Sequence, residues 1–297
     1  MTIKQNTLLL WALSVVPCLS QASSLYLSYN SEEQWAYVGE NSYLLSPDGG
    51  SLLLNYDLSE DWSLSLDIGQ LQDARQPDAP IRLSYKADAW GAGVSYYQEQ
   101  WSAYYQYSVY NDKQSTLDNG PGPDSTLKIH SKTHSSGVSY HWVNNDNWQL
   151  TSSAGLHYSD WQQQQTDRPD DPDRAMTHTT TPGNATIGSI ALNLTGFNRP
   201  NDVYELSYGS YVSWNQVFNS ETQSQNTEQR APNRRNRSEP NHNRNNLVAS
   251  GSESYGLINV YVAVSVAENW ILDVDASRDF GSDDNSHSWS MNLGYIF

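Results

Sequence analysis

A histidine and a serine two residues apart are the side chains of this sequence best spaced for nucleophilic chemistry. His134 and Ser136 lie in the segment 131–143, which alternates like a β-strand. Side chains two residues apart project from one face of a strand, so the imidazole could act as general base for the hydroxyl. Asp160, about three residues beyond the position opposite His134 on the next predicted strand, is the candidate third member.

The same segment resembles the His-x-Ser-Asn-Gly motif of outer-membrane phospholipases, which hydrolyse acyl esters from the outer face of a barrel. It departs from that motif because no Asn precedes Gly137 and because a strand, not a loop, is predicted to follow. The alternative, polar side chains at the outer end of a strand, is favoured. We therefore predict that the chain is not an enzyme, with Ser136, His134 and Asp160 as weak catalytic candidates.

Charged residues also recur on the polar parity of the predicted strands. Seven are expected to face inward: Asp57, Asp67, Arg82, Lys86, Glu205, Asp273 and Asp275. Charges of both signs on an inner face suit a passage for a solute, and they suit equally a lumen that salt bridges close.

Five arginines, at positions 230, 234, 235, 237 and 244, lie in one polar segment, 218–254. Such a cluster could bind the phosphates of lipopolysaccharide or of a host polyanion, although a solvated loop is the simpler interpretation. The histidines have no ligand spacing apart from His130 and His134, and no phosphate-binding loop is present. We predict no metal site and no cofactor.

Strands must position these residues, since apolar side chains alternate with polar ones along most of the chain. In 257–266, Ile258, Val260 and Val262 have one parity, and Asn259 and Tyr261 have the other. Alternation of this kind predicts a half-buried strand. It does not by itself distinguish a soluble sandwich from a membrane barrel.

A recurring turn favours the barrel. Short polar segments end in an aromatic residue that opens the next strand on its apolar parity: Trp62, Trp90, Trp148, Tyr204 and Trp270. Aromatics at one height that all face outward describe a girdle at a lipid interface. The connections at the other end are long, near 31–50, 111–130, 162–186 and 218–254, as in outer-membrane barrels.

The last strand resembles the C-terminal signal of Gram-negative outer-membrane β-barrel proteins. Trp289, Met291, Leu293, Tyr295 and the terminal Phe297 share one parity. The resemblance implies a barrel folded by the barrel-assembly machinery, with Tyr295 and Phe297 as the recognised residues.

The beginning of the chain has the layout of a secretory signal peptide. Lys4 precedes an apolar core at 8–16, and small residues end at Ala22, so we expect cleavage of residues 1–22 and a barrel over 23–297. The core is too short to span a membrane. The single cysteine, Cys18, lies inside this signal, so no disulfide is expected in the mature chain.

Composition agrees with this placement. The chain contains 20 Tyr and 11 Trp but 4 Phe, and Tyr and Trp favour membrane interfaces. Its net charge of −17 argues against nucleic acid as a partner.

The strand count gives a transmembrane, antiparallel, up-and-down β-barrel of twelve strands, with ten or fourteen as alternatives. The doubtful member is 90–110, in which the apolar parity changes. A bulge near 98–100 would explain the change, whereas a hairpin there would make thirteen strands.

The expected function is a small, porin-like passive channel for a small solute, in contact with outer-membrane lipid and lipopolysaccharide. The alternatives are a non-conducting barrel for surface interactions and, less favoured, the lipid-face acyl hydrolase that uses His134 and Ser136. A secretion translocator is disfavoured, because strands begin just after the predicted cleavage site.

Overall fold

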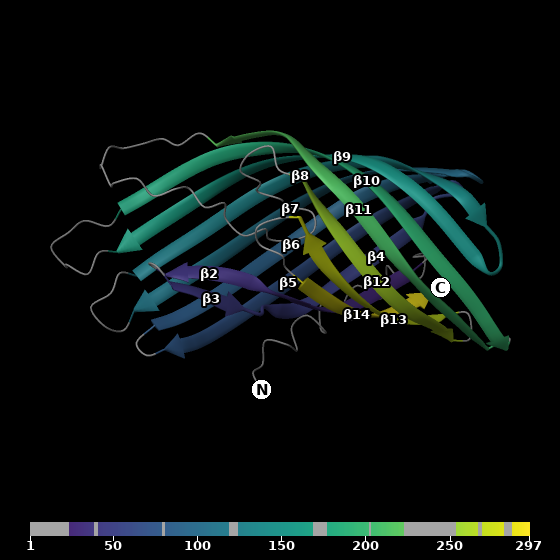
Figure 1. Ribbon diagram of the computed structural model, residues 1–297, viewed down its shortest axis with the longest axis horizontal. Helices are drawn as coiled ribbons and strands as arrows, with labels where there is room; N and C mark the ends of the chain where they lie inside the picture. The colour runs from purple at the N-terminus through teal and green to yellow at the C-terminus, as the bar shows by residue number, and fades with distance from the viewer. Residues whose placement is uncertain are drawn as a thin grey trace.

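Twelve antiparallel strands form a closed barrel in the computed structural model, which describes residues 24–38, 41–78, 81–118, 124–168, 177–201, 203–222, 254–266, 269–281 and 287–297 (Figure 1). The barrel strands are β1 (Ser24–Glu32), β4 (Asp48–Asp57), β5 (Trp62–Asp78), β6 (Ile81–Tyr97), β7 (Trp101–Asp118), β8 (Asp124–Asn144), β9 (Trp148–Arg168), β10 (Thr177–Asn201), β11 (Tyr204–Thr222), β12 (Ser254–Val266), β13 (Trp270–Phe280) and β14 (His287–Ile296). The prediction of an all-β barrel of twelve strands is confirmed.

The first strand closes the barrel. β1 pairs with β14, where Leu27 is opposite Leu293, and also with β4, where Leu27 is opposite Leu52. Each barrel strand therefore has two hydrogen-bonded neighbours, which removes the exposed edges that would be costly in lipid. Among the described residues, no helix is long and apolar enough to cross a membrane.

On β12 and β13 the apolar parity faces outward. Ile258, Val260 and Val262 on β12 are 42%, 52% and 50% exposed, and β13 alternates exposed and partly buried residues throughout. An apolar outer face of this extent is unusual on a soluble protein. It is the surface that a membrane barrel turns toward lipid. The alternation predicted for these two strands is confirmed.

The segment 81–110 is a hairpin, which corrects the prediction. Residues 81–97 form the single strand β6, and the turn at 98–100 is closed by a 2.7 Å hydrogen bond from Gln98 N to the Trp101 carbonyl. Position 90, predicted to open a strand, lies in the middle of β6, where Trp90 is opposite Ile68. The strand count stays at twelve, because the predicted turn at 87–89 does not exist.

Several strands run far beyond the length that a membrane requires. β8 and β9 have 21 residues and β10 has 25, whereas about 9–11 residues span a bilayer. The wall from β5 to β11 accordingly extends past β12–β14 at one end of the barrel (Figure 1). We call this end the long-loop rim, and the end with the connections 58–61, 98–100, 145–147, 202–203 and 267–269 the short-turn rim.

The predicted loops are correspondingly too long. Residues 111–118 and 124–130 belong to β7 and β8, and residues 162–168 and 177–186 belong to β9 and β10. Within 31–50, β2 (Gln34–Val38) and β3 (Asn41–Leu45) form a separate hairpin. Backbone pairing continues beyond the lipid, where neither face needs apolar side chains, so the loss of alternation in the sequence does not mark the end of a strand.

A buried apolar cluster occupies the interior beside β5, β6 and β7. Its members are Leu45, Leu71, Leu83, Tyr85, Ala87 and Tyr110. Leu45 comes from the end of β3, and the next residue, Ser46, donates its backbone N–H to Asp73 of β5 at 2.8 Å. The segment that follows the β2–β3 hairpin therefore packs against the inner wall and fills this side of the lumen.

Candidate functional site: the barrel interior

A large interior space lies on the side of the barrel away from the apolar cluster. A cavity of about 670 Å³ is lined by inward residues of β7–β14, and a second of about 230 Å³ lies against β1, β4, β5, β6, β7 and β14. Both are bordered by Glu32 and Ser288. Along β13 the larger cavity reaches from Asp273, near the short-turn rim, to Asp279, near the long-loop rim.

Acidic side chains dominate the ionisable lining of these two cavities. The acids are Glu32, Glu33, Asp67, Asp273, Asp275 and Asp279. Among the described residues that line them, the basic side chains are two histidines, His157 and His287, with no lysine or arginine. A lumen with this lining attracts cations and repels anions.

Hydrogen bonds from neighbouring strands hold the carboxylates in place. Asn259 donates to Asp275 at 2.8 Å, and Ser290 donates to the other oxygen of the same carboxylate. Asn292 donates to Asp273. These donors belong to β12 and β14, on either side of β13, so the three-strand register fixes where the negative charge lies in the cavity.

Five of the seven residues that were predicted to face inward do lie at inward positions of their strands. Asp273, Asp275 and Asp67 line the cavities, and Asp67 accepts a 3.2 Å hydrogen bond from Gln106. Glu205 forms an ion pair with Arg199 near the short-turn rim. Asp57 is exposed at the end of β4, also near that rim.

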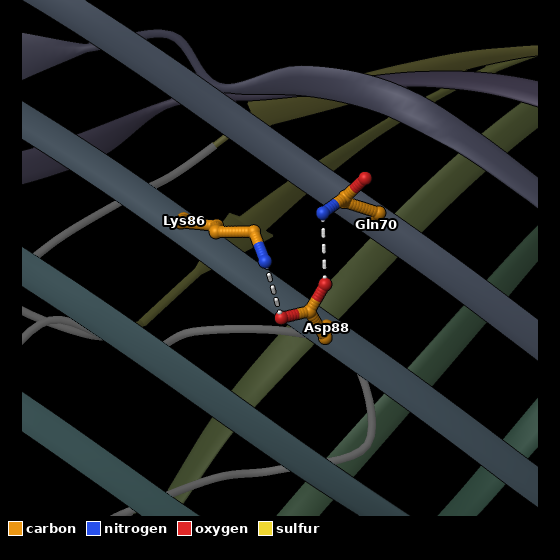
Figure 2. Close-up of polar contacts among 3 residues, drawn as sticks. All are labelled: Gln70, Lys86 and Asp88. Carbon is orange, nitrogen blue, oxygen red and sulfur yellow. Dashed lines mark hydrogen bonds and ion pairs between the residues drawn. The ribbon is translucent and has the colours of Figure 1, made fainter. Parts of the chain in front are cut away.

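Arg82 and Lys86 were predicted inward and are on the outer face, which is a correction. Both are exposed, whereas Leu83 and Tyr85 between them are buried in the apolar cluster. Figure 2 shows Lys86 on the barrel wall beside Asp88 and Gln70, with a 2.9 Å ion pair between Lys86 Nζ and Asp88. The physical reason is the apolar cluster inside the barrel. At this height the inward side chains of β6 are apolar and the outward ones are polar, the opposite of the arrangement in the lipid-facing band.

Sequence reasoning missed several ionisable residues of the cavity lining, among them Glu32 and Asp279, and it missed Arg199, the ion-pair partner of Glu205 near the short-turn rim. Glu32 and Arg199 lie in segments predicted as loop or turn, beyond the predicted strand ends. Asp279 had a signal, since it continues the parity of Asp273 and Asp275 on β13.

The candidate catalytic residues do not assemble into a triad. His134 Nδ1 lies 2.7 Å from the Tyr105 hydroxyl, and in the described part of the chain no hydrogen bond joins His134 to Ser136. Asp160 is opposite Lys132, two residues beyond Tyr158, the residue opposite His134. All three side chains have the outward parity.

Four members of the predicted girdle open strands at the short-turn rim and are exposed: Trp62, Trp148, Tyr204 and Trp270. The prediction for the fifth, Trp90, is wrong, because Trp90 lies within β6. Trp101 opens the next strand at the short-turn rim instead, after the turn at 98–100. Tyr295 packs against Trp270 and Phe297, with ring centroids 4.8 and 4.9 Å apart. The predicted signal peptide 1–22 and the arginine cluster of 218–254 lie outside the described residues.

No protein-family model matches the chain, and no curated protein sequence matches it. Among solved structures, the translocator domain of the autotransporter NalP from Neisseria meningitidis is similar, with a TM-score of 0.66 and 12% identity over 99% of this chain and 96% of that one. The β-domain of the Bordetella autotransporter BrkA gives 0.63 and 11%, over 93% and 100%. The transport unit of AIDA-I from Escherichia coli gives 0.54 and 13%, over 92% and 90%.

At these identities the likeness shows the fold alone. The chain therefore has the fold of a Gram-negative outer-membrane β-barrel.

Proposed function

We propose that the chain is an outer-membrane channel through which small solutes pass passively, with a preference for cations. Export by a signal peptide at 1–22 and assembly through Tyr295 and Phe297 by the barrel-assembly machinery are part of the proposal. It needs no cofactor.

The observation that carries the proposal is the acidic cavity. A space of about 670 Å³ follows β13 for most of its length, and its lining combines carboxylates with small hydroxyl side chains. Such a lining can replace part of the hydration shell of a cation. One carboxylate about 5 Å from a passing monovalent cation contributes about 0.8 kcal/mol even in bulk water, so several in series change the ratio of cation to anion substantially.

The test is ion selectivity of the folded barrel in planar bilayers. The double variant Asp273→Asn/Asp275→Asn removes two lining charges, and Asn retains the size of the side chain and one oxygen. We expect the cation-to-anion permeability ratio, measured from reversal potentials in a salt gradient, to fall severalfold.

Asp88→Asn is the matched control. It removes one carboxylate by the same Asp-to-Asn change, but from the outer face of β6, where Asp88 pairs with Lys86. The control should leave the permeability ratio unchanged. A folded wild-type barrel without conductance, or equal effects of the two sets of variants, contradicts the proposal.

A non-conducting barrel for surface interactions is the second candidate, and the apolar cluster favours it. Leu83 is fully buried, and Tyr85 and Tyr110 share a hydrogen bond between their hydroxyls, so this half of the lumen is filled. In that case the wild type is silent and function depends on the long-loop rim.

A further inference from the structure

The four lysines of the described chain all lie on the outer face of three adjacent strands. Lys86 is on β6, Lys113 on β7, and Lys128 and Lys132 on β8, and the one other lysine of the sequence is Lys4. All four are exposed, and most of the residues next to them in the chain are buried. We call these four residues the lysine patch.

The register places three of these charges side by side. Lys86 is opposite Lys113, and Lys113 is opposite Lys128. Residues directly opposite one another have Cα atoms about 4.5–5.5 Å apart, and like charges in such pairs are destabilising. An arrangement of this kind is stable when an anion lies between the ammonium groups.

Acidic neighbours compensate only the edges of the patch. Asp88 forms its ion pair with Lys86, with both side chains about half exposed (53% and 51%) (Figure 2). Asp160 is opposite Lys132. Among the described residues, neither Lys113 nor Lys128 has an ion pair with a carboxylate. The centre of the patch is therefore positive on a chain whose net charge is −17.

The height of the patch follows from strand geometry. On β13 the outermost outward residues, Trp270 and Phe280, are ten positions apart, which at a tilt near 40° is about 26 Å, the height of the lipid-facing band. Lys86 is likewise ten residues from Tyr96, which is opposite Trp62 at the short-turn rim. Lys86 therefore lies at the upper edge of the band.

The other lysines lie at that edge or above it. Lys132 is ten residues from Trp142 along β8, and Lys113 is twelve from Trp101 along β7. Lys128 is fourteen from Trp142. The ammonium groups thus extend from the edge of the apolar band to about 10 Å beyond it, which is the layer of lipid headgroups.

We propose that the lysine patch binds the phosphate groups of lipopolysaccharide in the outer leaflet. Ammonium groups form charge-assisted hydrogen bonds with phosphate oxygens, and a lipid whose phosphates lie at the level of the headgroups meets the patch without leaving the bilayer. The proposal rests on placement in the outer membrane and does not depend on conductance.

The test is binding of diphosphoryl lipid A to the folded protein in neutral detergent, measured by native mass spectrometry. Lys113→Gln/Lys128→Gln removes the two uncompensated charges, and we expect at least a tenfold loss of affinity. Asp88→Asn should bind two- to fivefold more tightly, because it removes the acid beside Lys86. The loss in the double variant should shrink as salt is raised.

Two controls test whether binding is specific to the lysine patch and to phosphate. Arg278→Gln removes an exposed outward cation on β13, away from the patch, and should leave the affinity unchanged. Lipid A without phosphates should bind wild type and Lys113→Gln/Lys128→Gln equally. All variants are first checked for a folded barrel by heat-dependent electrophoretic mobility.

The proposal is overturned if the double variant binds diphosphoryl lipid A as wild type does, or if Arg278→Gln loses as much affinity. It is also overturned if millimolar inorganic phosphate displaces the lipid completely, since the patch would then be a site for free phosphate.

Discussion

Arginine introduced on the two faces of β12 should have very different effects on stability. Val262 is 50% exposed on the outer face, opposite Val274 of β13 and Tyr208 of β11, near the middle of the apolar band. An Arg at the midplane of a barrel's lipid face costs about 2–4 kcal/mol. We expect Val262→Arg to lower the free energy of unfolding by that amount.

Asn259→Arg is the matched substitution on the inner face of the same strand. Asn259 lines the cavity of about 670 Å³, and its side-chain nitrogen lies 2.8 Å from a carboxylate oxygen of Asp275. A guanidinium there replaces the amide donor with a charged one and meets several acids. We expect a change below about 1 kcal/mol, because an ion pair in a water-filled space contributes little.

The assay is urea unfolding of the protein in phospholipid vesicles, followed by Trp fluorescence. Both variants should unfold with the slope of wild type, so that midpoints report free energies directly. Equal destabilisation by the two variants, or greater destabilisation by Asn259→Arg, would refute the assignment of inner and outer faces on β12.

Further predictions concern the cluster, a turn and the catalytic candidates. Leu83→Ala should lower the free energy of unfolding by about 2–5 kcal/mol in the same assay, because Leu83 is fully buried and its removal leaves a cavity; a change below 1 kcal/mol would contradict the packed cluster. Gly281→Ala should cost about 1–2 kcal/mol, because Gly281 has φ of 80°; no loss would mean that the turn relaxes. Ser136→Ala should leave the hydrolysis of p-nitrophenyl esters by the folded barrel at the background rate; loss of a measurable activity would instead identify a lipid-face hydrolase.

The sequence predicted the parts of the fold that contact lipid. On β12 and β13 the alternation placed Val262 outward and Asp273 and Asp275 inward, because an apolar medium outside and water inside impose a two-residue period. For the same reason Trp62, Trp148 and Trp270 correctly marked strand starts at the short-turn rim, whereas Trp90 did not.

Prediction from the sequence failed where lipid no longer sets the alternation of apolar and polar side chains. At the upper edge of the band and beyond it, Lys86 and Lys128 face outward on regular strands whose inward residues Leu83 and Ile129 are buried. There the apolar parity reverses, and parity alone assigns the wrong face. In β6 the apolar residues change parity at 87–90, and because Asp88 is a residue that turns favour, a turn and a change of parity within one strand both fit the sequence there.

The packing of Leu45 inside the barrel could not be predicted, since it depends on where a hairpin folds in three dimensions. The candidate site was predicted in part, because the inward carboxylates of β13 follow from alternation but their cavity does not. The cavity lies on the side of the lumen that Leu45 and its partners do not fill.

The most direct test of the account is the reversal potential of the folded wild-type barrel in a planar bilayer under a tenfold potassium chloride gradient. We expect stable single-channel steps and a reversal potential displaced toward the value for potassium, because the described cavity lining is acidic. Absence of steps from a barrel shown to be folded, or a displacement toward the value for chloride, would contradict the account.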